Sequence, residues 1–364
     1  MTSIIDHLER GQLRPSATYA TIGDTEVVWV FDDFGGEHDA LRSGAGLIDA
    51  SAGGPIRVSG DAATALLQEA LTRDVEFLIP DHAQNSLLLD DDGGVVDVVT
   101  VVGGEADHIV LTSPGRAGLV TAALRAVAER GALDAIVENC QATTAVFAIE
   151  GPQSWRVVAD VLGTGYVSIA YESALPVEIE GSDALIVRIG VTGEYGYTFI
   201  APVEIAALVW ERFVAHGGAP AGHRARELAM FEVRHPIVHR EVWPGDTVIT
   251  AGLNWLVDPA KQRFVGRDAM LAAGPSSARV RPIGFRVNDG DVSLGDELFV
   301  ADEHIGSIVY LTHSPDLLPE MGLAKIDKQW QASRLQFTTA SGARVQTLAP
   351  PYVVPLSWTS AIEA

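Results

Sequence analysis

Cysteine is nearly absent from this chain. The 364 residues include one, Cys140, so no internal disulfide can form, which fits a reducing compartment. No apolar run approaches the ~20 residues that a membrane helix needs. The segment Met1–Arg10 also lacks the basic start and apolar core of a signal peptide. We therefore predict a cytoplasmic protein with no membrane partner and interpret Cys140 as structural.

Basic residues are also scarce. The chain has 25 Lys and Arg against 48 Asp and Glu, a formal net charge of −23. Such a surface repels phosphate backbones and supplies no basic stripe for counterion release. We therefore predict no nucleic-acid partner, and an acidic protein partner is disfavoured.

The length exceeds the roughly 250–300 residues at which a single core stops growing, so more than one domain is expected. Apolar residues make up 47% and charged residues 20% of the chain, which is ordinary for a globular protein. A Pro/Ser segment at residues 274–278 resembles a domain boundary. We predict one region over residues 1–275 and a second domain over residues 276–364.

The segment Arg188–Phe199 is rich in glycine. Gly190, Gly193 and Gly196 separate two strand-like runs, and Glu194 lies between the runs. Glycine at this density permits positive φ and close approach of a ligand to the main chain. A carboxylate held at such a turn can accept two parallel hydrogen bonds from a planar N–H pair. The alternative is a hairpin whose glutamate is merely solvated, and this segment alone leaves both open.

A second candidate, Asp97, interrupts an apolar strand. The segment Ser86–Val102 consists of two β-branched runs around Asp-Asp-Gly-Gly, which predicts a hairpin. Val95 and Val99 share the strand face of Asp97, where a carboxylate is costly to bury unless it is paired or used. Burial there raises a carboxyl pKa, which suits acid–base chemistry. The alternative is an edge strand with Asp97 facing water.

A strand, a glycine and a helix occur twice in the same order. The first copy is a strand at Pro55–Gly60 and a helix at Ala62–Leu71 with Asp61 as N-cap. The second is a strand at Ala145–Gly151 and a helix at Ser154–Leu162. The repetition predicts two related α+β subdomains, although this pattern is also common by chance.

Beyond residue 278 the chain changes to short β segments at regular spacing, which predicts a small antiparallel barrel or sandwich. These segments are Ile283–Val287, Glu297–Val300, His304–Tyr310, Gly322–Lys325 and Leu335–Thr338.

His235 and His239 lie four residues apart with Glu241 nearby, a spacing that can bind zinc on a helix. Pro236 lies inside the pair and disrupts a regular helix. We therefore predict no metal site and interpret these residues as the polar lining of a pocket.

Five motifs occur in the same order as in a known family. Over roughly residues 37–355 the chain resembles the aminomethyltransferase family, which comprises the glycine cleavage T-protein and its folate-dependent relatives. Each motif is weak alone, but their collinearity is specific. The matching segments are Gly93-Gly-Val-Val-Asp97, Arg188-x-Gly-x-Thr-Gly-Glu-x-Gly196, Ala221-Gly-x-x-Ala-Arg-Glu227, Gly252-Leu-Asn-Trp255 and Phe264-Val-Gly-Arg-Asp-Ala269.

The resemblance implies a fold of two related α+β subdomains around a central pocket, with a C-terminal antiparallel β-barrel. It implies tetrahydrofolate as the cofactor and Asp97 as the catalytic carboxylate. Glu194 is then expected to hold the pterin ring and Arg226 to contact the folate. Tyr171 and Trp255 are expected to pack against its rings.

Several positions depart from the family pattern. Ser51-Ala-Gly53 stands where T-proteins often have Ser-His-Met, and Asn85 stands where Tyr is common. Val98 replaces a second Asp, and Met230 replaces an Arg. The pterin side is retained while the donor side varies, which predicts folate binding with a changed one-carbon donor.

The first hypothesis is therefore a tetrahydrofolate-dependent transferase that takes a methyl or aminomethyl group from a methylated small molecule. One alternative is the aminomethyltransferase of glycine cleavage, which uses a lipoyl carrier protein. That partner is usually acidic, so the charge of −23 disfavours it unless basic residues gather locally. The candidates for such a cluster are Arg224, Arg226, Arg234, Arg240, Lys261, Arg263 and Arg267.

Two further alternatives remain. One is a non-catalytic folate-binding protein, but that branch of the family carries a Lys-Gly-Cys-Tyr-x-Gly-Gln-Glu motif, and Cys140 is not in such a motif. The other is recruitment of the fold to chemistry without free folate.

Overall fold

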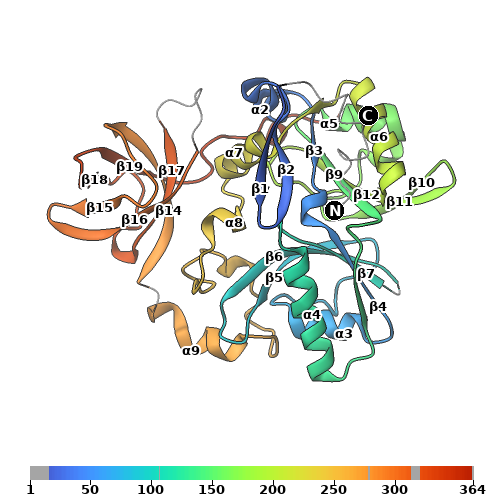
Figure 1. Ribbon diagram of the computed structural model, residues 1–364, viewed down its shortest axis with the longest axis horizontal. Helices are drawn as coiled ribbons and strands as arrows, with labels where there is room; N and C mark the ends of the chain where they lie inside the picture. The colour runs from blue at the N-terminus through green and yellow to red at the C-terminus, as the bar shows by residue number, and fades with distance from the viewer. Residues whose placement is uncertain (1–15, 106, 278, 313–319, 363–364) are drawn as a thin grey trace.

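A computed structural model describes residues 16–105, 107–277, 279–312 and 320–362. Two open sheets and a closed barrel form its framework, and a hairpin of β1 (Thr18–Ile22) and β2 (Thr25–Val30) lies against them. Figure 1 shows the barrel at one end of the molecule and the two sheets at the other. This mixed α+β architecture with a C-terminal barrel confirms the predicted fold class.

The first sheet has six strands in the order β10-β11-β12-β9-β3-β13. Helices α5 (Ser154–Leu162) and α6 (Val203–Ala215) pack against it, and their apolar faces join one core cluster around Phe147 and Phe199. The strands are β3 (Gly46–Asp49), β9 (Thr144–Glu150), β10 (Ala174–Ile179), β11 (Ser182–Val187), β12 (Gly196–Pro202) and β13 (Ala219–Pro220).

The second sheet has five strands in the order β5-β6-β7-β4-β8. Helices α3 (Ala63–Ala70) and α4 (Ala117–Gly131) cover one face and share a core with it (Figure 1). The strands are β4 (Pro55–Ser59), β5 (Ala83–Leu89), β6 (Val95–Gly103), β7 (Asp107–Leu111) and β8 (Ile136–Asn139).

The two strand–glycine–helix units belong to different sheets. One is β4, Gly60 and α3, and the other is β9, Gly151 and α5. Both glycines have positive φ, +99° and +134°. The predicted cap of the first helix is wrong, because its N-cap is Ala62 and no side chain caps it. The repeated pattern therefore corresponds to one α+β unit in each sheet.

The C-terminal strands close into a barrel in the order β14-β17-β16-β15-β18-β19. Its interior is apolar, with Phe285, Ile308 and Phe337 among the buried side chains. Because the strands close on themselves, the domain is a barrel and not a sandwich, the two alternatives that the sequence left open. The strands are β14 (Val280–Asp289), β15 (Glu297–Val300), β16 (Glu303–Leu311), β17 (Met321–Asp327), β18 (Gln336–Thr339) and β19 (Arg344–Leu348).

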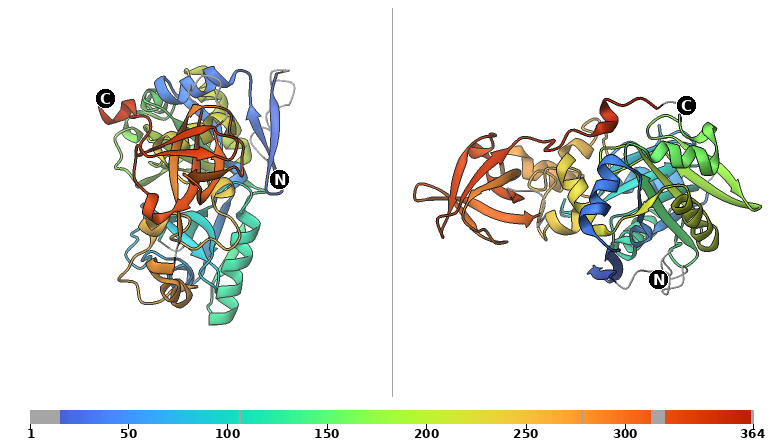
Figure 2. Two further views of the ribbon diagram at one scale, coloured as in Figure 1. Left: turned by 90° about the vertical axis from the view of Figure 1, so that its left-hand side faces the viewer. Right: turned by 90° about the horizontal axis from the view of Figure 1, so that it is seen from above.

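Helices connect the sheets to the barrel. Helix α2 (Phe34–Ser43) packs on α7 (His223–Val233), followed by α8 (Val238–Glu241) and by α9 (Arg267–Ser277), which is kinked at Gly274. After the barrel the chain runs back along the first region (Figure 2, right). The backbone N–H of Tyr352 donates to Glu232 O at 2.6 Å. The predicted division at residues 275 and 276 stays a prediction, and the C-terminal segment contacts both parts.

Substitutions at Gly151, which follows β9, and at Gly163, which follows α5, test how closely the backbone packs against the end of α2. A Cβ at Gly151 would lie 2.4 Å from Gly44 O, whereas a Cβ at Gly163, which also has positive φ (+107°), would meet nothing within 4 Å. We expect Gly163→Ala to cost roughly 1–3 kcal/mol from backbone strain alone, and Gly151→Ala to cost more because of the added clash. Urea unfolding followed by circular dichroism measures both. Equal losses for the two variants would contradict the close approach of Gly151 to α2.

Candidate active site

Asp97 is buried in the middle of a sheet. Strand β6 lies between β5 and β7, and Asp97 is paired in register with Leu88. Its exposed fraction is 0%, so the edge-strand alternative is wrong. Oδ2 accepts a hydrogen bond from Ser113 N at 3.0 Å, whereas Oδ1 is buried and has no partner among the described residues. One oxygen of a buried carboxylate is therefore left for a donor from a ligand.

Burial raises the pKa of Asp97 from 3.8 to about 6, and the hydrogen bonds from Ser113 and the charge of Arg116 offset this only in part. The raised pKa confirms what the sequence predicted for a carboxylate on this strand face. Near neutral pH such a group exchanges a proton readily, which is what general acid–base chemistry requires.

The partner of Asp97 is positioned by a backbone contact between two loops. Thr112 N donates to Gly53 O at 3.0 Å, and a Cβ at Gly53 would lie 2.3 Å from Thr112 O. The short 3-10 turn Ser51–Gly53 and the loop after β7 therefore pack backbone to backbone. This contact holds Ser113 N against the carboxylate. No local sequence pattern connects Ser113 with Asp97, which lies 16 residues earlier, so the sequence does not predict this contact.

A partly buried cation, Arg226, lies on helix α7. Arg226 Nε is buried and has no hydrogen-bond partner among the described residues. Burial lowers the pKa of this guanidinium, and the nearby carboxylates of Glu150 and Glu227 oppose that shift. Arginine remains charged in proteins nonetheless. Arg226 thus offers a donor deep in the first region, as Asp97 offers an acceptor.

Two neutral histidines accompany Arg226. Burial and the charge of Arg226 lower the pKa of His223 to about 3 and that of His235 to about 4. His223 Nε2 donates to Asp49 O at 3.1 Å, and His235 Nδ1 donates to Pro236 O at 3.3 Å. These carbonyls fix both tautomers, which leaves one acceptor nitrogen on each ring. His235, interpreted from the sequence as polar lining of a pocket, lies close enough to Arg226 to be affected by its charge, and its role stays a prediction.

The glycine-rich loop between β11 and β12 surrounds a carboxylate of the protein itself. Glu150 Oε2 accepts from Val191 N, Thr192 N and Thr192 Oγ1 at 2.7–2.9 Å. A Cβ at Gly190 would lie 2.9 Å from the same oxygen. The close approach that the glycines permit is therefore made by Glu150.

Glu194 differs from the expectation in its surroundings. Its exposed fraction is 7%, so it is not a solvated hairpin residue. Oε1 accepts from Leu356 N at 3.0 Å, and Oε2 accepts from Ser357 N at 2.8 Å and from Ser357 Oγ at 2.5 Å. The carboxylate does bind a pair of N–H groups, but they belong to the C-terminal segment. In this conformation both oxygens of Glu194 accept hydrogen bonds from the protein, and its expected contact with a pterin stays a prediction.

Arg42 joins this loop to the helices. Its Nε donates to Glu232 at 2.6 Å, and its Nη1 lies 3.6 Å from Glu194 Oε1. Two further N–H groups donate to the backbone carbonyls of Thr192 and Ala229. The structure makes Arg42 the link between α2, α7 and the glycine-rich loop.

The two predicted aromatic contacts lie in different places. Tyr171 is 62% exposed, and the charges of Glu150 and Arg188 act on its hydroxyl, so it lies beside the glycine-rich loop. Trp255 is 58% exposed and lies in a 3-10 turn that faces the barrel. Tyr171 is therefore near the Glu150 side of the site, whereas Trp255 lines a separate cleft.

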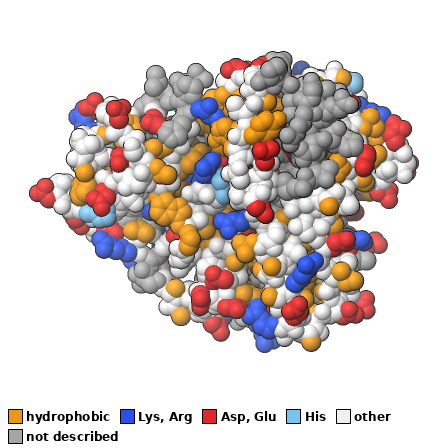
Figure 3. All heavy atoms as spheres, in the orientation of Figure 1, with side chains coloured by type: hydrophobic (Ala, Val, Ile, Leu, Met, Phe, Trp, Pro, Cys, Tyr) orange, Lys and Arg blue, Asp and Glu red, His pale blue; other side chains and the backbone are white. Residues whose placement is uncertain are grey.

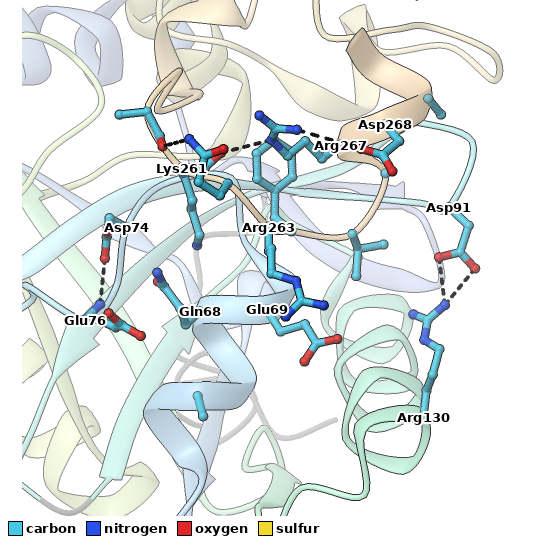
Figure 4. Close-up of a pocket in the computed structure, with 17 residues that line it drawn as sticks. Gln68, Glu69, Asp74, Glu76, Asp91, Arg130, Lys261, Arg263, Arg267 and Asp268 are labelled. Atoms are coloured by element: carbon cyan, nitrogen blue, oxygen red, sulfur yellow. Dashed lines mark hydrogen bonds and ion pairs between the residues drawn. The ribbon is translucent and has the colours of Figure 1, made fainter. Parts of the chain in front are cut away.

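The basic residues proposed as a docking cluster do not gather in one place. Arg224 stacks on Phe34 at 4.2 Å and Arg240 on Trp29 at 5.5 Å, near the barrel. Lys261, Arg263 and Arg267 line another cleft, of about 930 Å³, beside α3 and α4. Figure 4 shows this cleft with its basic and acidic side chains interleaved. Its acidic members are Glu69, Asp74, Glu76, Asp91 and Asp268.

The face seen in Figure 3 has acidic side chains scattered over it with Lys and Arg among them. Among the described residues that line the 930 Å³ cleft, basic and acidic side chains are mixed, so this cleft offers no purely basic patch to an acidic protein. In the part of the chain that the structure describes, no helix is long and apolar enough to cross a membrane, and no three His, Cys, Asp or Glu side chains are grouped to hold a metal ion.

Comparison with known proteins identifies the family. The GCVT N-terminal domain family matches residues 11–261. An aminomethyltransferase of Mycobacterium avium (strain 104) is 31% identical over 330 residues, which covers 87% of this chain and 88% of that protein. The chain belongs to the aminomethyltransferase family. The aminomethyltransferase of Bacillus subtilis (strain 168) is 29% identical over 315 residues, 84% of this chain and 86% of its own length.

A solved member of this family has the same fold. The structure of the glycine cleavage system aminomethyltransferase T from Bartonella henselae superposes with a TM-score of 0.86 and covers 96% of this chain and 97% of its own. Its sequence identity is 21%, so it supports the fold alone. With the aminomethyltransferase relatives, family membership makes this chain a one-carbon transferase, in preference to a non-catalytic binding protein.

The raised pKa of Asp97 predicts an effect on stability. In the folded state this carboxyl binds its proton more tightly than in the unfolded state, so its contribution is full below pH 3.8 and is lost as the pH rises through about 6. We expect Asp97→Asn to increase the free energy of unfolding at pH 7.5 by roughly 1–3 kcal/mol, with no increase at pH 3.5. Urea unfolding at both pH values measures this. A loss of stability at pH 7.5 would contradict the burial of an ionised carboxylate.

The contacts of Glu194 predict a local effect. Glu194→Ala removes the acceptor of Leu356 N and Ser357 N. We expect backbone amide exchange in residues 355–358 to become at least tenfold faster, because a lost charged hydrogen bond is worth ~1.5–3 kcal/mol. Hydrogen exchange with mass spectrometry measures this, and Glu204→Ala at the start of α6 is the control. Unchanged protection of residues 355–358 would show that Glu194 does not hold the C-terminal segment.

Proposed function

We propose that the enzyme transfers a methyl or aminomethyl group from a small-molecule donor to tetrahydrofolate. The observation that carries the proposal is the half-satisfied carboxylate of Asp97, buried and with one oxygen unpaired. Arg226 Nε is an unpaired donor in the same region of the fold. An acceptor and a donor of this kind suit a reduced pteridine, whose ring carries both N–H groups and acceptor atoms. The residues present therefore fit the cofactor.

Tetrahydrofolate supplies the nucleophilic nitrogen that receives the one-carbon group. Transfer of the group to that nitrogen would release one proton and would leave the donor's heteroatom with the bonding electron pair, so a residue that can hold and return a proton is needed. Asp97 accepts the proton at Oδ1 and returns it to the departing heteroatom. Its pKa of about 6 allows both steps near neutral pH.

The other residues orient the reactants. Arg226 binds an acceptor of the cofactor, and the neutral rings of His223 and His235 present acceptor nitrogens without adding a charge beside the cation. Tyr171 keeps its proposed role as a ring contact at the Glu150 side of the site, and Trp255 would contact only a part of the folate that reaches the cleft beside the barrel. Glu194 keeps its proposed pterin contact, which Oε1 would share with the backbone N–H of Leu356. The proposal therefore rests on Asp97 and Arg226.

A second candidate is the aminomethyltransferase of glycine cleavage, with a lipoyl carrier protein as donor. The names of the relatives favour it. The interleaved charges around Lys261, Arg263 and Arg267 and the net charge of −23 oppose docking of an acidic carrier. We therefore place it second.

Two assays separate these functions. In the first, the protein is incubated with tetrahydrofolate and a panel of N-, O- and S-methylated small molecules, and mass spectrometry detects 5-methyltetrahydrofolate. In the second, an aminomethyl-loaded lipoyl protein replaces the panel, and methylenetetrahydrofolate is detected.

We expect product in the first assay and a loss of at least 100-fold in Asp97→Asn, as is typical for removal of a general acid–base group. Asp91→Asn serves as the control, because Asp91 belongs to an exposed ion pair with Arg130. This variant is expected to retain activity. Product only with the carrier would replace the first function by the second. No product in either assay would contradict folate-dependent transfer.

A further inference from the structure

The tip of the hairpin formed by β1 and β2 (Figure 1) touches the loop of residues 112–116, which follows β7. Each side of the contact has a glycine with positive φ, +63° at Gly23 and +72° at Gly115. A Cβ at Gly23 would lie 2.9 Å from Gly115 O, and a Cβ at Gly115 would lie 2.3 Å from Ile22 O. The two backbones therefore pack directly on each other.

The short 3-10 turn at residues 51–53 joins the hairpin and the loop in one packed unit. Ala52 is 4% exposed and packs with Ile22 and Val27 of the hairpin. Its carbonyl accepts a hydrogen bond from Gly115 N at 2.9 Å. Ala52 is one of the positions at which the chain departs from the family pattern. A small residue there leaves room for the hairpin to reach the loop.

This loop carries two of the groups that act on Asp97. Ser113 N donates to Oδ2 at 3.0 Å. Burial raises the pKa of Asp97 to about 6, and the hydrogen bonds of Ser113 and of the Val98 backbone and the charge of Arg116 oppose this rise. Ser113 and Arg116 both belong to the loop. The position of the loop therefore affects how readily Asp97 ionises.

The sheet alone does not fix the loop. The pairing of β6 with β7 ends at Thr100 and Leu111, so Ser113 lies beyond the last paired residue. Its position depends on the contacts of the loop with the 3-10 turn and with the tip of the hairpin. A displacement of Gly115 is thus transmitted to Ser113 N, two residues earlier in the chain.

We propose that the turn at Gly23 is a positioning element for Asp97, because it holds Gly115 and thereby keeps Ser113 N on the carboxylate. Gly23 touches no reacting atom, so it acts through Ser113. The consequence for turnover rests on the proposed function, whereas the effect on the ionisation of Asp97 does not.

The test measures the ionisation of Asp97 in Gly23→Ala by carbon-13 NMR titration of side-chain carboxyls, with Asp97→Asn to assign the signal. The added Cβ displaces Gly115 and weakens the hydrogen bond from Ser113 N, which raises the pKa of Asp97. We expect the ratio of ionised to protonated Asp97 near pH 6 to fall about threefold or more. Gly115→Ala alters the other side of the contact and is expected to act in the same direction.

Gly181→Ala is the matched control. Gly181 lies in the turn between β10 and β11 and has φ +77°, but a Cβ there would meet nothing within 4 Å. The variant carries the same kind of backbone strain without the contact, so Asp97 is expected to titrate as in the wild type. Gly23→Asn separates the two effects further, because asparagine tolerates positive φ and still adds a Cβ. It is expected to raise the pKa of Asp97 as Gly23→Ala does.

The pH dependence of transfer in the assays above is expected to move to higher pH in Gly23→Ala and to stay unchanged in Gly181→Ala. A shifted titration of Asp97 without transfer in the wild type would contradict the proposed function and support the positioning role. An unchanged or lowered pKa of Asp97 in Gly23→Ala and Gly115→Ala, or an equal shift in Gly181→Ala, would overturn the inference.

Discussion

Buried carboxylates, each completed by donors from distant parts of the chain, hold the first region together. Glu150 takes three hydrogen bonds from the glycine-rich loop, and Glu37 takes one from Gly222 and two from residues 31 and 32. The carboxylate of Glu232 forms hydrogen bonds with the side chains of His38 and Arg42. A carboxylate without such partners is too costly to bury. The helices and the loop are therefore fixed by the need to satisfy these groups.

The same rule makes Asp97 stand out. Both oxygens of Glu37 and of Glu232 accept from protein groups, and Glu150 Oε2 accepts three hydrogen bonds. By contrast, Oδ1 of Asp97 is buried and has no partner among the described residues. A half-satisfied buried carboxylate keeps a raised pKa and lowers stability, which is the usual cost of a reactive group. Arg226 is a partly buried cation whose Nε is buried and has no hydrogen-bond partner in the part of the chain that the structure describes. The proposed cofactor site is built on this pair of unsatisfied atoms.

Local sequence patterns predicted the features that depend on residues close together in the chain, such as turns and the burial of a strand residue. The Asp-Asp-Gly-Gly turn gave the hairpin of β5 and β6, and the apolar alternation around Asp97 predicted its burial and raised pKa. Glu194 differs because its partners, Leu356 and Ser357, follow more than 160 residues later. A glycine-rich turn indicates that a backbone approaches closely, but it does not tell whether a ligand or the protein itself fills the space. Ser113 carries no local signal for the same reason.

The central claim is that Asp97 Oδ1 and Arg226 are completed by a reduced folate. The most direct measurement is a crystal structure of the protein with 5-methyltetrahydrofolate, a stable product of the proposed transfer. The account predicts a ring N–H within hydrogen-bond distance of Asp97 Oδ1 and an acceptor of the folate on the Arg226 guanidinium. A folate bound elsewhere, with both atoms still unpaired, would contradict it.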